Sequence, residues 1–338
     1  MISKSTLQKA SDENIINKNQ VEPLYRFIQN EQQVNKSLKN QEEPLKFVRS
    51  FGDVFIALGV ILLAVSINMT SLTGYYYLIP AAGLVIIAEW LVRIRRLALP
   101  GIVILLCILF FINKAFSFEH DNATTLGLSL ISLSSLMFYL RYKMPFSLLP
   151  LSASLVAITV IQIGLDVLQS PVIFAVLGLI IFCIAMWFDC RDTKRQSHLS
   201  DSAFWLHLLA SPLIVHGAMI SLLTSDKVWV QSLSNDILMI IFFAVFFLVA
   251  LFVDRRAMLV STQLYAIYAL TQLFQNDFIG SQNVMIYVLM ALGMFVIFFG
   301  TYWYKTRWIV FGVLSGSKIS RYVPDLKIQD TKQKDYRK

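Results

Sequence analysis

One apolar stretch of this sequence holds an unusual set of side chains that could carry chemistry. Asp201, His207, Pro212 and His216 lie close together in a run that is otherwise rich in leucine and alanine. Imidazole groups exchange protons near neutral pH and bind metal ions. The nine-residue spacing places the two histidines about 180° apart around a straight helix. They are therefore poor partners in one metal site, and the sequence offers no evident third ligand.

We expect each histidine to form a hydrogen bond with a neighbouring helix. A proton relay or a contact with a substrate is the alternative role for either one. Pro212 has no N–H, so it leaves a helical carbonyl near Leu208 without its usual partner. Ser211 or a water molecule could bind that carbonyl instead.

A second candidate group is the acidic and basic triplet Asp254, Arg255 and Arg256. It follows one apolar run and precedes another, which predicts a tight turn. The Asp254 carboxylate could orient the two guanidinium groups, but we favour the interpretation that Asp254 is a turn residue. Asp254 and Arg255 are kept as candidate functional residues, because ionisable groups near a membrane are costly unless they are paired.

Two further acids have basic residues four positions away, which is one helical turn. Glu89 precedes Arg93, and Asp53 follows Arg49. Both pairs lie near the ends of apolar runs. We therefore interpret them as ordinary ion pairs at an interface rather than as functional groups.

Polar side chains at similar depths in the membrane suggest one more group, towards the outer face. Gln162, Asp166, His216 and Gln272 come from three different apolar runs. Together they could line a cavity that opens outward. This grouping depends on how separate helices pack, which periodicity does not define.

No catalytic or cofactor motif is present. The sequence contains no GxSxG nucleophile turn, no phosphate-binding P-loop, no GxGxxG and no HExxH, and no paired carboxylates lie deep within an apolar run. Cys107, Cys183 and Cys190 form no CxxC and no cysteine–histidine spacing typical of zinc. We therefore predict no enzyme activity, no cofactor and no metal site.

The composition is typical of a membrane protein. Hydrophobic residues make up 57% of the chain and charged residues only 15%, and the mean hydropathy is +0.64. Such a composition cannot cover a water-facing surface but suits contact with lipid. The net charge of +8 follows from the basic residues that membrane proteins collect on one side. Nucleic acid is therefore not an expected partner, whereas the lipid bilayer is.

Ten apolar runs approach the length of about 20 residues that a membrane-spanning helix needs. The sequence therefore predicts an all-α polytopic transmembrane helix bundle of about ten spans, covering residues 50–305. The runs are 51–68, 75–92, 97–113, 123–140, 145–165, 171–188, 202–223, 236–253, 257–275 and 284–304.

Basic residues alternate with these runs in a way that sets the orientation. With both termini inside, 27 of the 29 lysines and arginines lie on the inner side, and only Lys114 and Lys227 lie outside. Lysine and arginine concentrate in the cytoplasmic loops of membrane proteins. We therefore predict a multi-pass protein of the cell inner (cytoplasmic) membrane with both termini in the cytoplasm.

Polar segments precede and follow the apolar runs. Residues 1–49 are rich in Asn, Gln, Lys and Glu and predict a cytoplasmic tail that is largely mobile, with a short helix near 21–38. Residues 306–338 predict an interfacial helix over 308–323 that lies along the inner membrane surface, and then a short charged tail.

Three cytoplasmic turns look alike, at 90–100, 138–145 and 252–257: each has an aromatic residue, then basic residues, then a new apolar run. Anchoring at the interface is enough to produce this pattern, and no inverted repeat is visible. Glycines seven residues apart could mark helix-packing faces. They are Gly52 with Gly59 and Gly293 with Gly300.

Three segments carry a resemblance to known proteins. They are residues 43–53 before the first run, residues 201–216, and residues 254–261. In these segments and in its layout, the chain resembles an uncharacterised family of bacterial multi-pass inner-membrane proteins, defined by a domain of unknown function. The resemblance implies membrane residence and transfers no functional residues.

The sequence leaves the function open between classes. The ten spans and the histidine-bearing run with its proline favour a transporter-like protein for a small solute, although few charges lie at the membrane midplane. The lack of catalytic chemistry favours a non-catalytic membrane scaffold or assembly partner for another membrane protein. A lipid-processing enzyme ranks third, because it would need clustered acid and base groups at an interface.

The predicted topology can be tested with reporter fusions. Fusions after Asn122 and Lys227 should report an external location, and fusions after Arg96 and Arg195 a cytoplasmic one, since lysine and arginine determine orientation. A reversed signal at any one of these four positions would contradict the ten-span arrangement.

Overall fold

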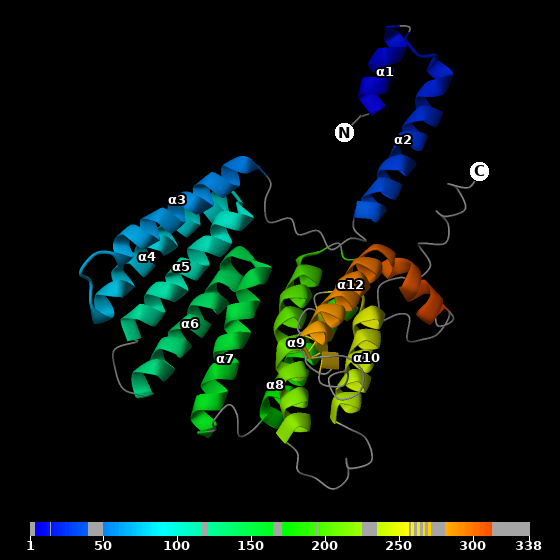
Figure 1. Cartoon of the computed structure of the whole chain (residues 1–338). Coiled ribbons are helices and arrows are strands. Elements are labelled where there is room, and N and C mark those ends of the chain that lie inside the picture. Colours follow the sequence, from blue (N-terminus) through cyan, green and yellow to red (C-terminus); the bar gives the residue numbers. More distant parts are fainter. Residues whose placement is uncertain are drawn as a thin grey trace. The chain divides into compact units, whose positions relative to one another are not determined.

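The structure is a computed structural model in which all regular structure of the described residues is helical (Figure 1). The described residues are 4–13, 15–39, 50–116, 121–164, 171–193, 195, 197–224, 235–256, 258–259, 262–263, 266–267, 270–271 and 281–312. Contacts divide the chain into two compact units, residues 1–46 and 47–338.

The first unit is a helical hairpin. It consists of α1 (Lys4–Asp12) and α2 (Lys18–Lys39), with Leu7 and Val21 buried. The helix predicted near 21–38 is therefore present as α2. The short helix α1 was not predicted, because its apolar residues are too few to show a clear period.

The second unit contains the long apolar helices. Its elements are α3 (Phe51–Asn68), η1 (Gly74–Tyr77), α4 (Leu78–Ala88), the π-helical η2 (Glu89–Ile94), α5 (Ala98–Phe116), α6 (Asp121–Tyr142), η3 (Pro145–Ser147), α7 (Leu148–Ile163), α8 (Pro171–Arg191), α9 (His198–Thr224), α10 (Asn235–Val253) and α12 (Ser281–Phe311). These elements match nine of the ten predicted apolar runs. The remaining run, 257–275, falls largely outside the described residues.

Seven of the described helical segments are long and apolar enough to cross a membrane. The apolar part of α10, Ile237–Val253, is shorter than the others. Helix α6 is not among the seven, and it carries several serines and threonines between its apolar residues. One of these serines joins it to α7 through a hydrogen bond of 2.7 Å between the hydroxyls of Ser132 and Ser154. The structure thus supports an integral membrane protein.

The turns that follow η2, α6, α8 and α10 share a backbone feature. Each contains a non-glycine residue with positive φ: Arg96 (55°), Lys143 (50°), Arg195 (51°) and Asp254 (62°). A left-handed residue after the last helical turn lets the chain bind the open carbonyls and reverse direction. The turns that look alike in sequence therefore also share a backbone conformation. We call the end of the second unit that carries these four turns the basic end.

The second unit contains two main apolar cores. One is formed by α3 to α6 and η3, around side chains such as Ile104, Leu105 and Phe111. The other is formed by α7, α8, α9, α10, α12 and the described residues that follow α10, around side chains such as Val215 and Met219. At the basic end the rings of Phe146 and Trp205 meet edge to face, with centroids 4.8 Å apart. The two cores thus meet where η3 packs on α9.

Of the described helices, α8 and α9 make the most extensive contact with one another, and two glycines explain it. A Cβ at Gly217 would lie 2.5 Å from the Ala175 nitrogen and the Pro171 carbonyl oxygen, and a Cβ at Gly178 would lie 2.8 Å from the Ile214 nitrogen. The two backbones therefore touch directly.

The glycines singled out from the sequence do not serve this purpose. A Cβ at Gly59, Gly293 or Gly300 would meet nothing within 4 Å. The prediction that they mark helix-packing faces is therefore wrong among the described helices. Spacing along one helix does not reveal which partner helix approaches it.

Helix α12 is bent at Tyr302, whose φ of −102° and ψ of 17° are not helical (Figure 1). Trp308 to Phe311 thus belong to the second arm of a bent helix that begins well before residue 308. Residues 313–323, the remainder of the predicted interfacial helix, lie outside the described residues.

Candidate functional site

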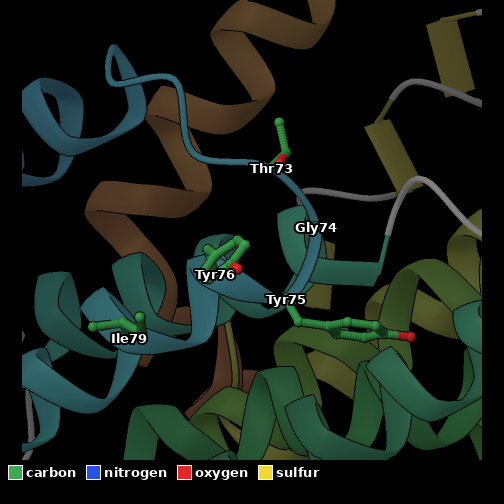
Figure 2. A pocket seen from close by; sticks show the side chains of 5 residues that line it. All are labelled: Thr73, Gly74, Tyr75, Tyr76 and Ile79. Atoms are coloured by element: carbon green, nitrogen blue, oxygen red, sulfur yellow. The ribbon is translucent and has the colours of Figure 1, made fainter.

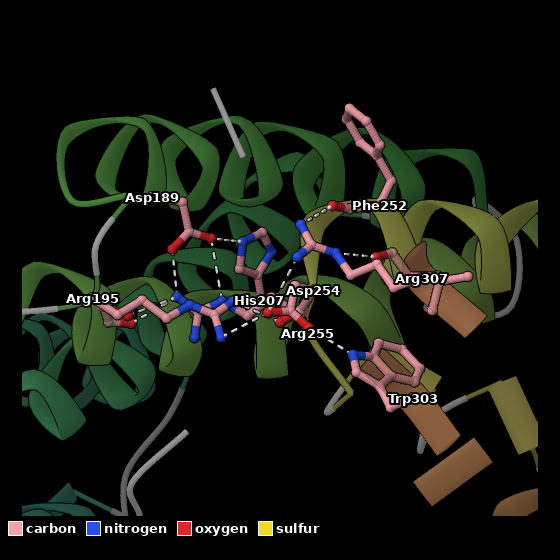
Figure 3. Close-up of polar contacts among 10 residues, drawn as sticks. Asp189, Arg195, His207, Phe252, Asp254, Arg255, Trp303 and Arg307 are labelled. Carbon is pink, nitrogen blue, oxygen red and sulfur yellow. Dashed lines mark hydrogen bonds and ion pairs between the residues drawn. The ribbon is translucent and has the colours of Figure 1, made fainter. Parts of the chain in front are cut away.

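Among the described residues of the second unit, most of the buried charge gathers at the basic end of α8, α9, α10 and α12 (Figure 3). The side chains come from segments more than 100 residues apart in the sequence. We call this group the buried charge cluster; its members are Asp189, Arg195, Ser200, His207, Asp254, Arg255, Trp303 and Arg307.

Asp189, in the last turn of α8, is the centre of one half of the cluster. Its side chain is 4% exposed. It accepts a hydrogen bond of 3.2 Å from Nε of Arg255 and a second one from Nη2 of the same residue. Nε2 of His207 lies 2.9 Å from its Oδ2 atom. A buried carboxylate is thus held by a two-pronged guanidinium contact and an imidazole, which is among the stronger pairing geometries.

Arg255 also connects this carboxylate to the start of α9. Its Nη2 donates to the carbonyl oxygen of Ser200 at 3.0 Å and to its hydroxyl at 3.2 Å. Arg255 is 1% exposed. Removing one partner from such a buried pair typically costs about 3–5 kcal/mol, because the other charge is left uncompensated.

Asp254 is the centre of the other half. It follows the last residue of α10 in the left-handed conformation, with φ of 62°, and the Arg255 N–H closes the helix end by donating to the Ala250 carbonyl at 3.0 Å. The Asp254 carboxylate forms an ion pair with Arg195, whose Nη1 lies 3.1 Å from Oδ2. Nη2 of the same arginine donates a hydrogen bond of 2.7 Å to the Asp254 carbonyl oxygen. Left-handed aspartate is strained by an amount of order 1 kcal/mol, which these contacts offset.

Helix α12 docks onto this turn through two side chains that follow its bend. The indole N–H of Trp303 donates to Asp254 Oδ1 at 2.6 Å. Arg307 donates from Nε to the Leu251 carbonyl at 3.1 Å and from Nη2 to the Phe252 carbonyl at 3.2 Å, and its Nη1 lies 3.9 Å from Asp254 Oδ2. A cation at the open carbonyls of a helix C-terminus is favourable. The bend at Tyr302 therefore serves to bring α12 onto the end of α10.

His207 is the member of the cluster whose side chain can take up a proton near neutral pH. It is fully buried. An ionised Asp189 only accepts hydrogen bonds, so Nε2 of His207 must carry the hydrogen that they share. The other ring nitrogen, Nδ1, is buried and has no hydrogen-bond partner in the described part of the chain. The ring of Phe182 meets the imidazole edge to face at 5.1 Å. Such an imidazole can bind one further proton.

The structure brings together three of the six candidate residues named from the sequence: His207, Asp254 and Arg255. The expectation that His207 binds a neighbouring helix is confirmed by its contact with Asp189. The interpretation of Asp254 as a turn residue is confirmed. Its carboxylate pairs with Arg195, from the turn between α8 and α9, and with Arg307 of α12, and not with its own neighbours as the alternative would have it.

Arg256, the third residue of that turn, lies over aromatic rings instead. Its guanidinium carbon is 5.6 Å from the Trp303 ring centroid and 5.0 Å from that of Tyr304. It is exposed.

The other three candidates lie outside the cluster. Asp201 is exposed in the first turn of α9, Pro212 is exposed, and His216 is half-buried. Near the proline, the Ser211 hydroxyl donates to the His207 carbonyl at 2.8 Å, one residue before the carbonyl that we expected it to bind.

The grouping predicted at the outer side is not supported by the described residues. The Gln162 amide lies 3.5 Å from the Thr125 hydroxyl, and no contact with His216 is observed for it there. Asp166 and Gln272 lie outside the described residues.

Sequence reasoning missed Asp189, Arg195, Trp303 and Arg307. The predicted sixth run ended at residue 188, one position before Asp189, and Arg195 was used only as a marker of topology. The available signal was an acid directly at the end of an apolar run, facing a histidine-bearing run across a short turn. Nothing in the sequence indicated that α12 bends back onto α10.

The first half of the second unit has a smaller counterpart of this cluster. Glu89 lies 2.8 Å from Arg141 Nη2 and 3.7 Å from Arg93 Nη1. The predicted Glu89–Arg93 pair is thus present, but Arg141 is the closer partner. These side chains are partly exposed, so each pair contributes about 0–1 kcal/mol.

The other predicted interface pair is only half described. Asp53 is buried and accepts a hydrogen bond of 3.1 Å from the Ser50 hydroxyl. Its predicted partner Arg49 lies outside the described residues.

Other features of the described residues offer less chemistry. No group of three or more His, Cys, Asp or Glu side chains among them could hold a metal ion. Figure 2 shows a pocket at the start of α4, the end of this helix away from the basic end. It is lined by Thr73, Gly74, Tyr75, Tyr76 and Ile79. It is mostly apolar and contains no carboxylate or basic group. The buried charge cluster is therefore the stronger candidate site.

Comparisons with protein-family models, with curated protein sequences and with solved structures gave no match for this chain. Function is therefore inferred from the geometry of the buried charge cluster.

Replacing Trp303 with Phe should lower the free energy of unfolding by about 1.5–3 kcal/mol, the range for hydrogen bonds to charged groups. The smaller phenyl ring also leaves space at this buried position, so lost packing adds to the loss of the bond to Asp254. Thermal unfolding of the purified protein in detergent measures it. Trp308→Phe on the same arm is the control, because Trp308 is 45% exposed, and it should change stability by less than about 0.5 kcal/mol. Equal effects of the two substitutions would show that the indole N–H contributes nothing.

Proposed function

We propose that this chain is a ten-span inner-membrane protein, with both termini in the cytoplasm, that transports a small solute. The buried charge cluster would form its cytoplasmic gate. The observation that carries the proposal is that buried ion pairs, in addition to apolar packing, join the ends of α8, α9, α10 and α12.

The energetics of buried ion pairs favour a switching role. Replacing a buried ion pair with well-packed apolar residues is often neutral or stabilising, so a purely structural joint does not need charges. A gate must instead have two arrangements of similar free energy. Charged groups can exchange partners with water or solute when the gate opens, which apolar packing does not allow as readily.

The separation of the two cores supports the same proposal. Alternating access in many transporters is a rocking of one helix bundle against another. Here α3 to α6 and α7 to α12 have distinct cores. An ion-paired cluster in the second bundle, near the contact between the two, is well placed to respond to such a movement.

His207 supplies a means of coupling transport to protons. Ionisable residues within membrane segments mark proton relays in pumps and transporters. The Nδ1 atom of His207 is buried beside the Asp189–Arg255 pair. A proton taken up there adds a positive charge next to Arg255, which would weaken the existing pairing and favour opening.

A non-catalytic scaffold or assembly partner is the second candidate, and one observation favours it. The direct backbone contact of α8 with α9 at Gly178 and Gly217 makes this hairpin tightly filled. A rigid hairpin suits a scaffold as well as it suits the fixed half of a transporter. The resemblance to an uncharacterised bacterial inner-membrane family is compatible with both and stays a prediction.

A proteoliposome assay separates the two candidates. The protein is reconstituted in vesicles that contain a pH-sensitive dye, a pH step is applied, and solutes are added by class: amino acids, sugars, inorganic phosphate, dicarboxylates and monovalent cations. We expect one class to accelerate proton entry by roughly tenfold or more over protein-free vesicles, equivalent to about 1.4 kcal/mol.

The two histidines of α9 provide matched variants for this assay. His207→Gln should abolish the solute-dependent proton flux, because an amide cannot take up the proton. His216→Gln should preserve it, since His216 lies outside the cluster. Full flux in a well-folded His207→Gln protein would reject the proton role. Absence of any solute-dependent flux in the wild type would favour the scaffold.

A further inference from the structure

Arg195 has a donor for which the structure provides no acceptor. Its side chain is 6% exposed. Nη1 and Nη2 are used by the carboxylate and carbonyl of Asp254, but Nε is buried and has no hydrogen-bond partner in the part of the chain that is described. Leaving a buried donor unmet costs about 1–3 kcal/mol, and more for a charged group. An oxygen atom is therefore expected next to this nitrogen.

The charges of the described cluster point to the kind of oxygen. Three arginines, at 195, 255 and 307, face two carboxylates, at 189 and 254. The carbonyls at the end of α10 offset part of the charge on Arg307, by about half an elementary charge. The unmet Arg195 Nε thus lies in a group of guanidinium side chains, which are the usual partners of carboxylate and phosphate oxygens.

We propose that the buried charge cluster is a binding site for a small oxyanion, a carboxylate or a phosphate group, with an oxygen that accepts the Arg195 Nε hydrogen. Figure 3 shows the side chains of Arg195, His207 and Arg255 converging between Asp189 and Asp254. The inference builds on the proposed transport function, because it names the class of solute. The binding itself is a separate property of the site.

An anion in this site would link binding to the proton on His207. The groups that face His207 are Asp189 from α8, Arg255 and Arg195 from the two turns, and the ring of Phe182. A proton on Nδ1 adds a further positive charge to this environment, and a bound anion offsets it. Proton and anion then enter together, which is the behaviour of a proton–anion symporter.

Two sources supply the same chemistry: a free anion in the cytoplasm, or the phosphate of an anionic lipid. A buried water molecule is the competing explanation, because water also accepts from Nε–H. Anion-dependent stability distinguishes these, since a ligand that binds only the folded state raises stability in proportion to its occupancy.

The test uses the full-length protein, purified in neutral detergent and depleted of lipid. Its thermal unfolding midpoint, Tm, is measured against the concentration of inorganic phosphate or succinate, with chloride keeping the ionic strength constant. Parallel samples receive phosphatidylglycerol or phosphatidylcholine in place of the free anions. We expect a saturable rise of Tm with phosphate, succinate or phosphatidylglycerol, but not with phosphatidylcholine.

Arg195→Lys is the informative variant, because it keeps the charge beside Asp254 but lacks the Nε–H donor. It should raise the half-saturating anion concentration by roughly tenfold or more, equivalent to about 1.4 kcal/mol. Arg191→Lys is the matched control: Arg191 is exposed, with its guanidinium carbon 3.8 Å from the Trp187 ring centroid, and its substitution should leave the concentration dependence unchanged.

The results distinguish a free anion from a lipid headgroup, and they can also overturn the proposal. A response to phosphate or succinate identifies a free anion, and a response to phosphatidylglycerol alone identifies a lipid headgroup. No response to any of them, or the same response in wild type and Arg195→Lys, would overturn the proposal and leave water at Arg195. Anion binding without solute-dependent proton flux would reject transport while leaving the binding site intact.

Discussion

A charge that leaves water for a membrane protein interior must find a partner there, and this requirement organises the basic end of the second unit. Asp189 and Asp254 are both buried at the ends of apolar helices. Each carboxylate takes its partners from other segments, so satisfying it brings α8, α9, α10 and α12 together. The apolar faces of these helices determine that they pack, and the two carboxylates determine which ends meet.

Backbone geometry makes this arrangement accessible. Arg195 and Asp254 both adopt the left-handed conformation in turns of neighbouring hairpins, and their side chains pair with one another. A glycine would adopt the same backbone at lower cost but would bring no charge. The ion pair between Arg195 and Asp254 therefore offsets the backbone strain of the two left-handed turns that it connects. The corresponding turns at Arg96 and Lys143 have the same backbone, whereas the nearby Glu89–Arg141 pair remains partly exposed.

The sequence predicted the helices much better than it predicted the site. Apolar runs such as 51–68 and 236–253 have lengths set by the membrane, so their boundaries agree closely with α3 and α10. His207 was recognised because a histidine in an apolar run needs a partner. Its partner Asp189 was missed, since an acid at the end of a run looks like any interface residue until the packing of α8 on α9 is known.

Long-range geometry accounts for the remaining differences. The docking of Trp303 and Arg307 depends on a bend at Tyr302 that no proline or glycine at that position announces. The close approach at Gly178 and Gly217 depends on which face of α8 meets α9. Hydrophobic periodicity contains neither kind of information, because both depend on contacts between segments far apart in the chain.

The central claim, that Asp189 and Arg255 act as one buried unit, is tested most directly by a double-mutant cycle. Unfolding free energies would be measured in one detergent for wild type, Asp189→Asn, Arg255→Gln and the double variant. We predict that each single substitution costs about 3–5 kcal/mol and that the double variant costs clearly less than their sum. Additivity within about 0.5 kcal/mol would show that the two side chains do not depend on each other, and would contradict the account.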